Sequence, residues 1–362
     1  MFMYNEFKSR YLFGSAFSEI LFVDRGLFFA PIYPPISGGA AIHFQQICSE
    51  LVKRDVIEQA VIITRYSKSM PLIESNDGKF IFRCLIPPDL VHKGNTYIRL
   101  GFNLSVVLFF VLLYIGILRA QTVHMHTKPE YRWGCSAAKR LGAKVIIDGR
   151  DPWAPDFPVE GDVFVAASRN IQSIASNRSE EVKYIPIGIE PDNFSDIKPS
   201  CPIQSRYFLF VGEIAEHKGV GVLLQTYESN EFDYPLYLIG RGKDEYLVNK
   251  ANNMENTHYE GEKTHQQTIH FIDNAELVIL PSREEALGRV VLECIMVGTP
   301  VICPPLPEYK KHIPEYVVDD ITPKSIAQKI PQLVQRTADD SNYPIERHYK
   351  HNVIDSYIEI YL

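Results

Sequence analysis

The segment 280–304, LPSREEALGRVVLECIMVGTPVICP, limits the fold of this chain more than any other stretch of its sequence. It follows an apolar run, residues 276–280, of the kind that forms a buried parallel strand. Residues 288–297 then repeat apolar side chains at helical spacing, and a glycine and a proline follow as stop signals. Residues 301–303 predict the next strand. The segment therefore predicts strand, loop, helix and strand in succession, which is one unit of a parallel α/β sheet.

Two glutamates mark this segment, Glu285 in the loop and Glu293 inside the helix, with seven residues between them. A loop at the C-terminal end of a parallel strand faces the crevice where such sheets bind ligands. The helix N-terminus beside it suits a phosphate. Glu285 could then reach a hydroxyl-rich group, and Glu293, about two turns into the helix, could accept hydrogen bonds from the hydroxyls of a ribose. The competing interpretation is that both are ordinary solvated glutamates, which two glutamates alone would favour.

The surrounding residues resemble the E-x7-E signature of family 4 glycosyltransferases, which are retaining enzymes of GT-B architecture. The matching positions are Pro281, Ser282, Glu285, Gly288, Leu292, Glu293, Met296, Gly298, Pro300, Val301 and Ile302. Ala286 and Leu287 replace the usual Gly-Phe pair. The resemblance implies a catalytic role for Glu285 and a donor site that includes Leu287, Gly288, Arg289 and Glu293.

The N-terminal half predicts a second parallel sheet. Residues 26–30 predict its first strand, and Gly38 and Gly39 precede a helix expected at 40–54. The resemblance places such a glycine pair near the donor phosphates, whereas a simple tight turn is the alternative. Further strands are expected at 61–64, 79–85 and 144–148. No G-x-G-x-x-G dinucleotide fingerprint occurs in the chain.

Residues 121–127, QTVHMHT, resemble the D-V-V-H-x-H strand of the same family. The resemblance implies that His126 lies at the catalytic centre near the donor sugar, and we expect His124 to pack in the core. Arg150 and Asp151 follow the strand at 144–148, at the edge of the crevice, where they could handle an acceptor. The alternative is that both are solvated loop charges.

Residues 184–194 resemble the signature that closes the N-terminal domain of the family, and a polar linker is expected at 191–204. A strand ending at Gly212 then opens the second domain, and Lys218 follows as in the family's F-V-G-R-L-x-x-x-K-G. Lys218 is expected to hold the donor diphosphate, because charge-assisted bonds to phosphate are strong. Glu213 stands at a donor-site position where the family usually has an arginine. A carboxylate there would repel a diphosphate.

Composition excludes several classes of protein. The chain has 362 residues, of which 46% are hydrophobic and 22% charged, as in soluble proteins with two domains. Its net charge of −7 argues against nucleic-acid binding. The six cysteines show no C-x-x-C pair and no D-x-D occurs, so we expect no metal. No signal peptide is evident in the first 30 residues, so a cytoplasmic protein is expected.

One apolar segment bears on membranes. Residues 105–118 are too few to span a bilayer, so an internal helix at about 101–119 is the default expectation. The alternative is peripheral docking of this helix on the inner face of an anionic cell membrane, where a lipid-linked acceptor would be reached.

These features predict an α/β chain of GT-B type, with two doubly wound Rossmann-like domains facing a cleft. The expected parts are an acceptor domain at 1–195, a donor domain at 205–345, and a C-terminal helix at 346–362 that crosses back. The expected function is metal-independent hexosyl or other glycosyl transfer from a nucleotide-sugar to a glycan or lipid-linked acceptor, in surface polysaccharide or glycoconjugate synthesis. No cofactor is expected, because the nucleotide-sugar is a substrate. Alternatives are a non-catalytic binding or scaffold protein of this fold and a nucleotide-sugar 2-epimerase.

Overall fold

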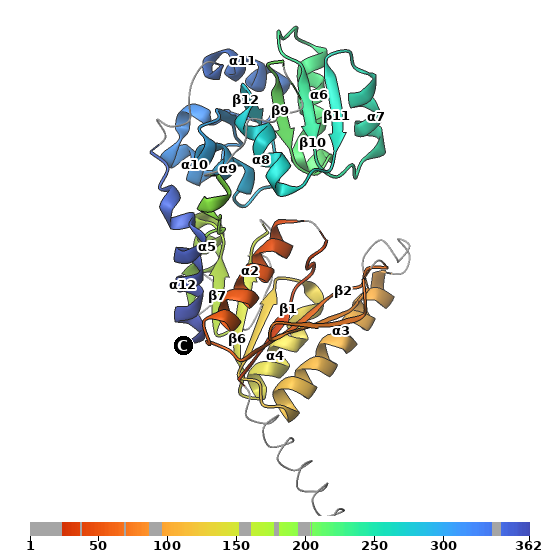
Figure 1. The fold of residues 1–362 in the computed structure, drawn as a ribbon, viewed down its shortest axis with the longest axis vertical. Coiled ribbons are helices and arrows are strands. Elements are labelled where there is room, and N and C mark those ends of the chain that lie inside the picture. The colour runs from red at the N-terminus through yellow and green to blue at the C-terminus, as the bar shows by residue number, and fades with distance from the viewer. Residues whose placement is uncertain are drawn as a thin grey trace, which may run out of the picture. The chain divides into compact units, whose positions relative to one another are not determined.

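The chain forms two compact units in the computed structural model, Met1–Ile185 with Ile354–Leu362, and Pro186–Val353 (Figure 1). The structure describes residues 24–36, 38–68, 70–86, 96–151, 161–176, 181–194, 203, 205–334 and 342–362. Most of the expected linker, 191–204, lies outside these residues.

The division between the units falls before residue 186, earlier than the expected domain end at 195. The reason is a set of hydrogen bonds within the second unit. The backbone N–H of Ile189 donates to the carbonyl of His348 at 2.7 Å, and Nδ1–H of His348 donates to the carbonyl of Ile187 at 3.0 Å. The segment that resembles a domain-closing signature is therefore tied to the end of the second unit.

The first unit is built on one eight-stranded sheet in the order β3-β4-β2-β1-β5-β6-β7-β8. All neighbouring strands are parallel except β3, which pairs antiparallel with β4. Its central strands are continuous apolar runs because both faces are covered. The strands are β1 (Arg25–Phe29), β2 (Gln59–Arg65), β3 (Ile73–Asn76), β4 (Lys79–Leu85), β5 (Thr122–His126), β6 (Lys144–Gly149), β7 (Val163–Ala166) and β8 (Val182–Tyr184).

The helices of this unit are α2 (Gly39–Lys53), α3 (Thr96–Val111) with its π-helical continuation η3 (Leu112–Ile117), the 3₁₀ turn η4 (Pro129–Tyr131), α4 (Arg132–Arg140) and α5 (Arg169–Ala175). Helix α12 (Lys350–Tyr361) belongs to this unit from Ile354 onward. Helices α3 and α4 pack against each other and lie side by side in Figure 1. Gly134 allows this close approach, because an added Cβ would lie 2.4 Å from a methyl group of Val107.

Helix α3 differs from the buried helix that was expected. With η3 it runs over Thr96–Ile117, 22 residues that are long and apolar enough, by length and composition alone, to cross a membrane. Only 33% of its most apolar window is buried. Asn103, Val107 and Phe110 face inward, whereas other large apolar side chains are exposed, namely Tyr97, Ile98, Phe102, Phe109, Leu112 and Ile117. The expected start near residue 101 was wrong, because α3 begins at Thr96.

A buried carboxylate, Asp148, ties α12 to the first unit. Its Oδ2 accepts hydrogen bonds from the Tyr357 hydroxyl at 2.9 Å and from a ring nitrogen of His43 at 2.7 Å. His124 lies 3.3 Å from the same oxygen, and Nε of Arg150 donates to Oδ1 at 2.7 Å. These donors come from α2, β5, α12 and the loop after β6. Arg150 beside it and the two histidines hold the pKa of Asp148 well below its usual range against the opposing effect of burial.

The second unit contains a five-stranded parallel sheet in the order β11-β10-β9-β12-β13. The strands are β9 (Phe208–Val211), β10 (Leu236–Ile239), β11 (Thr257–Gly261), β12 (Leu277–Ile279) and β13 (Val301–Ile302). The helices are α6 (Val220–Glu228), α7 (Glu245–Asn253), α8 (His265–Asp273), α9 (Arg289–Val297), α10 (Pro307–His312) and α11 (Pro323–Leu333). The 3₁₀ turns are η6 (Pro191–Phe194), η7 (Glu216–Lys218), η8 (Pro314–Tyr316) and η10 (Ile345–His348).

The strand–loop–helix–strand prediction for 280–304 is confirmed by β12, α9 and β13. Helix α9 ends at Gly298, which has φ 79°, a left-handed conformation that glycine adopts without strain. One apolar core joins the sheet to the helices around it.

The buried group of His43, His124, Arg150 and Tyr357 around Asp148 predicts that acid lowers the free energy of unfolding of the first unit. Burial, with Arg150 beside it, lowers the pKa of His43 from 6.5 to about 3. The unfolded chain therefore takes up a proton below pH 6.5 that the folded chain refuses until about pH 3. Stability should fall as the pH falls through this window, by about 1.4 kcal/mol per pH unit for one proton.

This expectation is checked by urea unfolding at pH 7, 6, 5 and 4. Tryptophan fluorescence suits it, because both tryptophans, at positions 133 and 153, belong to the first unit. His43→Gln keeps a donor toward Asp148 but cannot titrate, so the slope should become shallower. His351→Gln, an exposed position on α12, is the control. An unchanged slope in His43→Gln would contradict the assignment.

Candidate functional site

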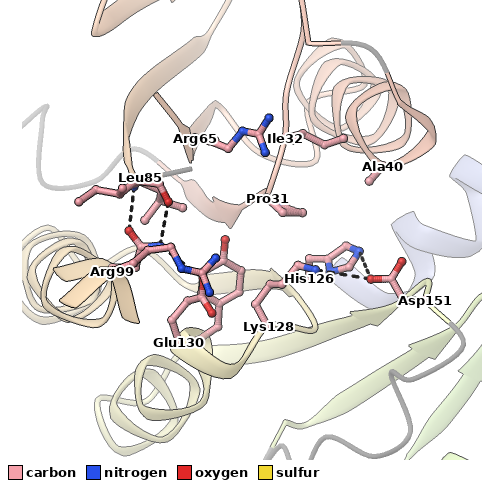
Figure 2. Close-up of a pocket in the computed structure, with 13 residues that line it drawn as sticks. Pro31, Ile32, Ala40, Arg65, Leu85, Arg99, His126, Lys128, Glu130 and Asp151 are labelled. Carbon is pink, nitrogen blue, oxygen red and sulfur yellow. Dashed lines mark hydrogen bonds and ion pairs between the residues drawn. The ribbon is translucent and has the colours of Figure 1, made fainter. Parts of the chain in front are cut away.

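A pocket of about 530 Å³ lies at the C-terminal edge of the first sheet (Figure 2). This is the edge where open parallel sheets bind ligands. The walls come from the ends of β2, β4 and β5, from the loops after β1 and β6, and from α3. The lining includes Pro31, Ile32, Ala40, Arg65, Leu85, Ile86, Arg99, Asn103, His126, Lys128, Glu130, Tyr131 and Asp151.

His126 lies at the end of β5 and is 2% exposed. Its Nδ1 lies 3.2 Å from the carbonyl of Thr127. Because a carbonyl only accepts, Nδ1 carries the proton in this bond. Burial lowers the pKa of His126, although the nearby Asp151 opposes this effect. The ring is therefore neutral near pH 7, and Nε2, 3.8 Å from a carboxylate oxygen of Asp151, presents a lone pair.

The two residues expected to handle an acceptor are separated by the structure. Asp151 lines the pocket, between His126 and the Lys128 ammonium at 3.7 Å. The side chain of Arg150 is instead only 8% exposed, and it donates to Asp148 and to the Tyr357 hydroxyl. We therefore assign Arg150 to the packing of α12, because the buried charge of Asp148 requires a compensating cation. His124 belongs to the same cluster, which agrees with the packing role expected for it.

The glycine pair opens α2 beside this pocket. Gly38 is the residue before the helix, with φ 146°, and Gly39 is its first residue. A Cβ added to Gly39 would meet nothing within 4 Å. The next residue, Ala40, lines the pocket. The N-terminus of a 15-residue helix thus lies at the pocket edge, which suits an anionic group.

In the second unit, Lys218 and Glu285 come together. They follow β9 and β12, which are neighbours in the sheet, and the Lys218 ammonium lies 2.7 Å from a Glu285 oxygen. Both side chains are partly exposed, at 25% and 22%. Gly219 permits this closeness: it has φ 74°, and a Cβ there would lie 1.9 Å from the carbonyl oxygen of Pro281. The glycine of the Lys-Gly pair is therefore required by the approach of the two loops.

Glu213 lies among cations. Its carboxylate is 3.1 Å from the ammonium of Lys243, 3.6 Å from the ring of His217 and 3.9 Å from the guanidinium of Arg241. The acid directly follows Gly212 and β9, at the position where the resembling family has arginine. Two cations, Lys243 and Arg241, therefore offset the negative charge that the sequence introduces there.

The N-terminus of α9 differs in detail from the expectation. The Leu287 side chain is 2% exposed and belongs to the core, so only its backbone could contact a donor. The backbone N–H of Gly288 already donates to the hydroxyl of Tyr309 at 2.8 Å. Arg289 is the first residue of the helix. We expected free backbone N–H groups at this helix terminus. At Gly288 this expectation is wrong, because its N–H already has a partner.

Glu293 is 2% exposed, inside α9, and does not lie on a wet helix face. One carboxylate oxygen lies 2.8 Å from Nε2 of His265, the first residue of α8. Sequence reasoning missed His265. The local sequence indicates only that His265 begins a helix, because Thr264 and Gln267 form a capping box around it.

Sequence reasoning also missed three basic residues of the first pocket, Arg65, Arg99 and Lys128. Lys128 lies two residues after His126, so a strand-end rule could have found it. Arg65 and Arg99 come from other elements, and no local signal joins them to His126. Among the described residues, no group of three or more histidine, cysteine or acidic side chains could hold a metal ion.

Residues 195–351 match the family described as glycosyl transferases group 1. D-rhamnosyltransferase WbpZ of Pseudomonas aeruginosa is 29% identical over 175 residues, 44% of this chain and 45% of that protein. TuaC of Bacillus subtilis, a glycosyltransferase named for teichuronic acid biosynthesis, is 24% identical over 207 residues, 54% of this chain and 50% of TuaC. The matches thus span about half the length of these relatives.

The structure resembles that of HepE from Anabaena, solved in complex with UDP and glucose. The TM-score is 0.67 with 14% identity, covering 93% of this chain and 99% of HepE. The predicted α/β fold of GT-B type, with parallel sheets in both units, is therefore confirmed.

Proposed function

We propose that this protein transfers a sugar from a nucleotide-sugar to a glycan or lipid-linked acceptor, in the synthesis of a surface polysaccharide or glycoconjugate. One observation carries the proposal. The domain match over 195–351 covers the loops that bring Lys218 and Glu285 to one edge of the sheet. The names of the relatives, a rhamnosyltransferase and a teichuronic acid glycosyltransferase, support the polymer assignment.

The donor would be held by the second unit. Glu293 would accept hydrogen bonds from the ribose hydroxyls, and Lys218 would neutralise the diphosphate as it departs with the bonding electrons. Glu285 would hold a sugar hydroxyl. The Lys218 ammonium lies 2.7 Å from the Glu285 carboxylate, so this pair of side chains would contact both sides of the bond that breaks. Leaving-group stabilisation of this kind requires no metal.

The first unit would hold the acceptor. Neutral His126 would accept a hydrogen bond at Nε2 from a sugar hydroxyl, while Asp151 lies 3.8 Å from that nitrogen. We propose retention of anomeric configuration, with the acceptor attacking on the face that the diphosphate leaves. The departing phosphate would then take the acceptor's proton.

The function is tested with a panel of nucleotide-sugars, by measuring free nucleoside diphosphate with and without a mixture of glycan and lipid-linked acceptors. Acceptor-dependent release from one donor is expected. Donor binding without release on any acceptor would instead identify a binding protein, and release of nucleotide without acceptor would identify a different reaction.

Two glutamate substitutions should separate binding from catalysis. The ribose hydroxyls are the same in donor and product, so Glu293→Gln should weaken donor and nucleoside diphosphate equally, about ten- to a hundredfold. Glu285→Gln should lower kcat by a similar factor and leave diphosphate affinity nearly unchanged, because the sugar changes shape and charge during transfer. Calorimetry and steady-state kinetics measure both effects.

The matched control for Glu285 is Glu284→Gln, an exposed neighbour in the same loop. The control for Glu293 is His265→Ala, which removes the partner but keeps the carboxylate. Melting curves report any loss of folding. If both glutamate variants keep wild-type affinity and turnover, the two residues only mark the fold.

At Glu213, in contrast to Glu293, we expect that removing the carboxylate charge strengthens nucleotide binding. If the diphosphate binds near the end of β9, Glu213→Gln removes a repelling charge and releases Lys243 and Arg241 to face the ligand. Nucleoside diphosphate affinity should rise severalfold, and the gain should shrink at high salt. Titration at low and high ionic strength measures this. Weaker binding in the variant would show that Glu213 serves by holding its basic neighbours in position.

We further propose that the first unit docks on an anionic membrane surface. The exposed apolar side chains of α3 support this, since they include Phe102 and Phe109 at 46% and 59% exposure. On the neighbouring helix α4, Trp133 is 62% exposed, with Arg132 and Arg140 at the two ends of the helix. Apolar and aromatic side chains beside basic ones are typical of interfacial helices.

Liposome flotation tests the docking. Vesicles that contain phosphatidylglycerol should float the protein at low salt, and the double variant Phe102→Ser, Phe109→Ser should remain in the dense fraction. Tyr246→Ser is the control, because Tyr246 is exposed by 71% on α7 of the second unit. Absence of wild-type binding to anionic vesicles would refute the docking without affecting the proposed chemistry.

A further inference from the structure

The pocket of the first unit has two arginines that the proposed chemistry does not use. Arg65 is the last residue of β2, and Arg99 lies in the first turn of α3. Both line the pocket that contains His126, and Figure 2 shows their side chains on its walls. Within the described part of the chain, neither guanidinium forms an ion pair or a side-chain hydrogen bond.

The acidic groups of the pocket are already engaged. Asp151 lies 3.7 Å from the Lys128 ammonium and 3.8 Å from His126. A carboxylate oxygen of Glu130 accepts a hydrogen bond from the amide of Asn103 at 3.4 Å. The pocket thus has three basic side chains, two acidic ones and a neutral histidine. Two cations remain available to a ligand.

Arginines with a structural role in this unit look different. Arg83 is 2% exposed, lies 2.9 Å from a Glu74 oxygen, and donates to the carbonyls of Pro71 and Pro34. Arg150 is likewise buried against Asp148. A buried guanidinium in this unit is therefore bonded by the protein itself. Arg65 and Arg99 are only half-buried, and they face open volume instead.

We propose that Arg65 and Arg99 bind an oxyanion group, a phosphate or a carboxylate, on the acceptor. This inference rests on the proposed function, because it describes the acceptor of that transfer. A planar guanidinium offers paired N–H donors that match both kinds of oxyanion. Helix α3 presents Arg99 and Asn103 to the pocket, while Ile98 and Phe102 are exposed on the same helix. An acceptor with a charged head and an apolar tail would use both faces.

Binding of three probes with the same tail tests the inference by calorimetry: n-octyl phosphate, n-octyl β-D-glucuronide and the neutral n-octyl β-D-glucoside. A charged probe should bind more tightly than the neutral one. Preference for the phosphate indicates a phosphorylated acceptor such as a lipid phosphate, and preference for the glucuronide indicates an acidic sugar. Either preference supports the oxyanion site.

Variants locate the binding. Arg65→Gln and Arg99→Gln should each lower the affinity for the preferred probe about ten- to a hundredfold. Arg65→Lys should lower it less, because lysine keeps the positive charge and loses only the paired N–H donors of the guanidinium. Lys53→Gln, an exposed position at the end of α2, should have no effect. Loss of probe binding in Lys218→Gln instead would assign the anion to the proposed donor site of the second unit. Melting curves confirm that each variant is folded.

Three results would overturn the inference: equal binding of neutral and charged probes, unchanged binding in both arginine variants, or loss of binding in Lys218→Gln instead. Because no donor is present, these results are independent of turnover. Acceptor-dependent release of nucleotide together with any of them would leave glycosyl transfer standing and reject only the charged acceptor. Tight, arginine-dependent probe binding with no release from any donor would reject the transfer while the anion site remained.

Discussion

The first unit depends on the buried carboxylate of Asp148, which is stable only because donors surround it. Leaving a buried charge without partners costs several kcal/mol, so α2, β5, α12 and the loop after β6 must all approach the same residue. His126 pairs with Asp148 in the β5–β6 ladder. The side chains that line the pocket, His126 and Asp151, therefore extend from a fixed point, which is how a rigid scaffold positions a site.

In the second unit, each carboxylate that we assign to the donor is already bonded to a base. Glu285 pairs with Lys218, and Glu293 pairs with His265. These pairs do not block a ligand, because an ionised carboxylate has about four lone-pair sites and the base uses one. The base fixes the rotamer, so the remaining oxygen is held ready for a hydroxyl group. Such preorganisation costs no rearrangement during the reaction.

Local pattern was enough to predict the parallel strands and the unit at 280–304, because apolar runs and helix stop signals are encoded within a few residues. It was not enough where partners are distant in sequence. Gly288 meets Tyr309, 21 residues later, and Arg150 turns inward toward Tyr357, 207 residues later. Arg65 and Arg99 share a pocket only because β2, β4 and α3 pack together. The motif residues were therefore found, and their partners were not.

Net charge is a poor guide to the proposed donor site for a physical reason. Residues 201–362 hold 15 basic against 24 acidic side chains, yet this half is expected to bind a diphosphate. Charges in water are screened beyond about 10 Å at moderate salt, so the distant acids contribute little. What a phosphate meets is set by the nearest groups. At the ends of β9 and β10, four basic side chains (His217, Lys218, Arg241 and Lys243) gather around two acids, Glu213 and Glu285. Strand order thus brings basic side chains beside these two acids, although residues 201–362 as a whole are acidic.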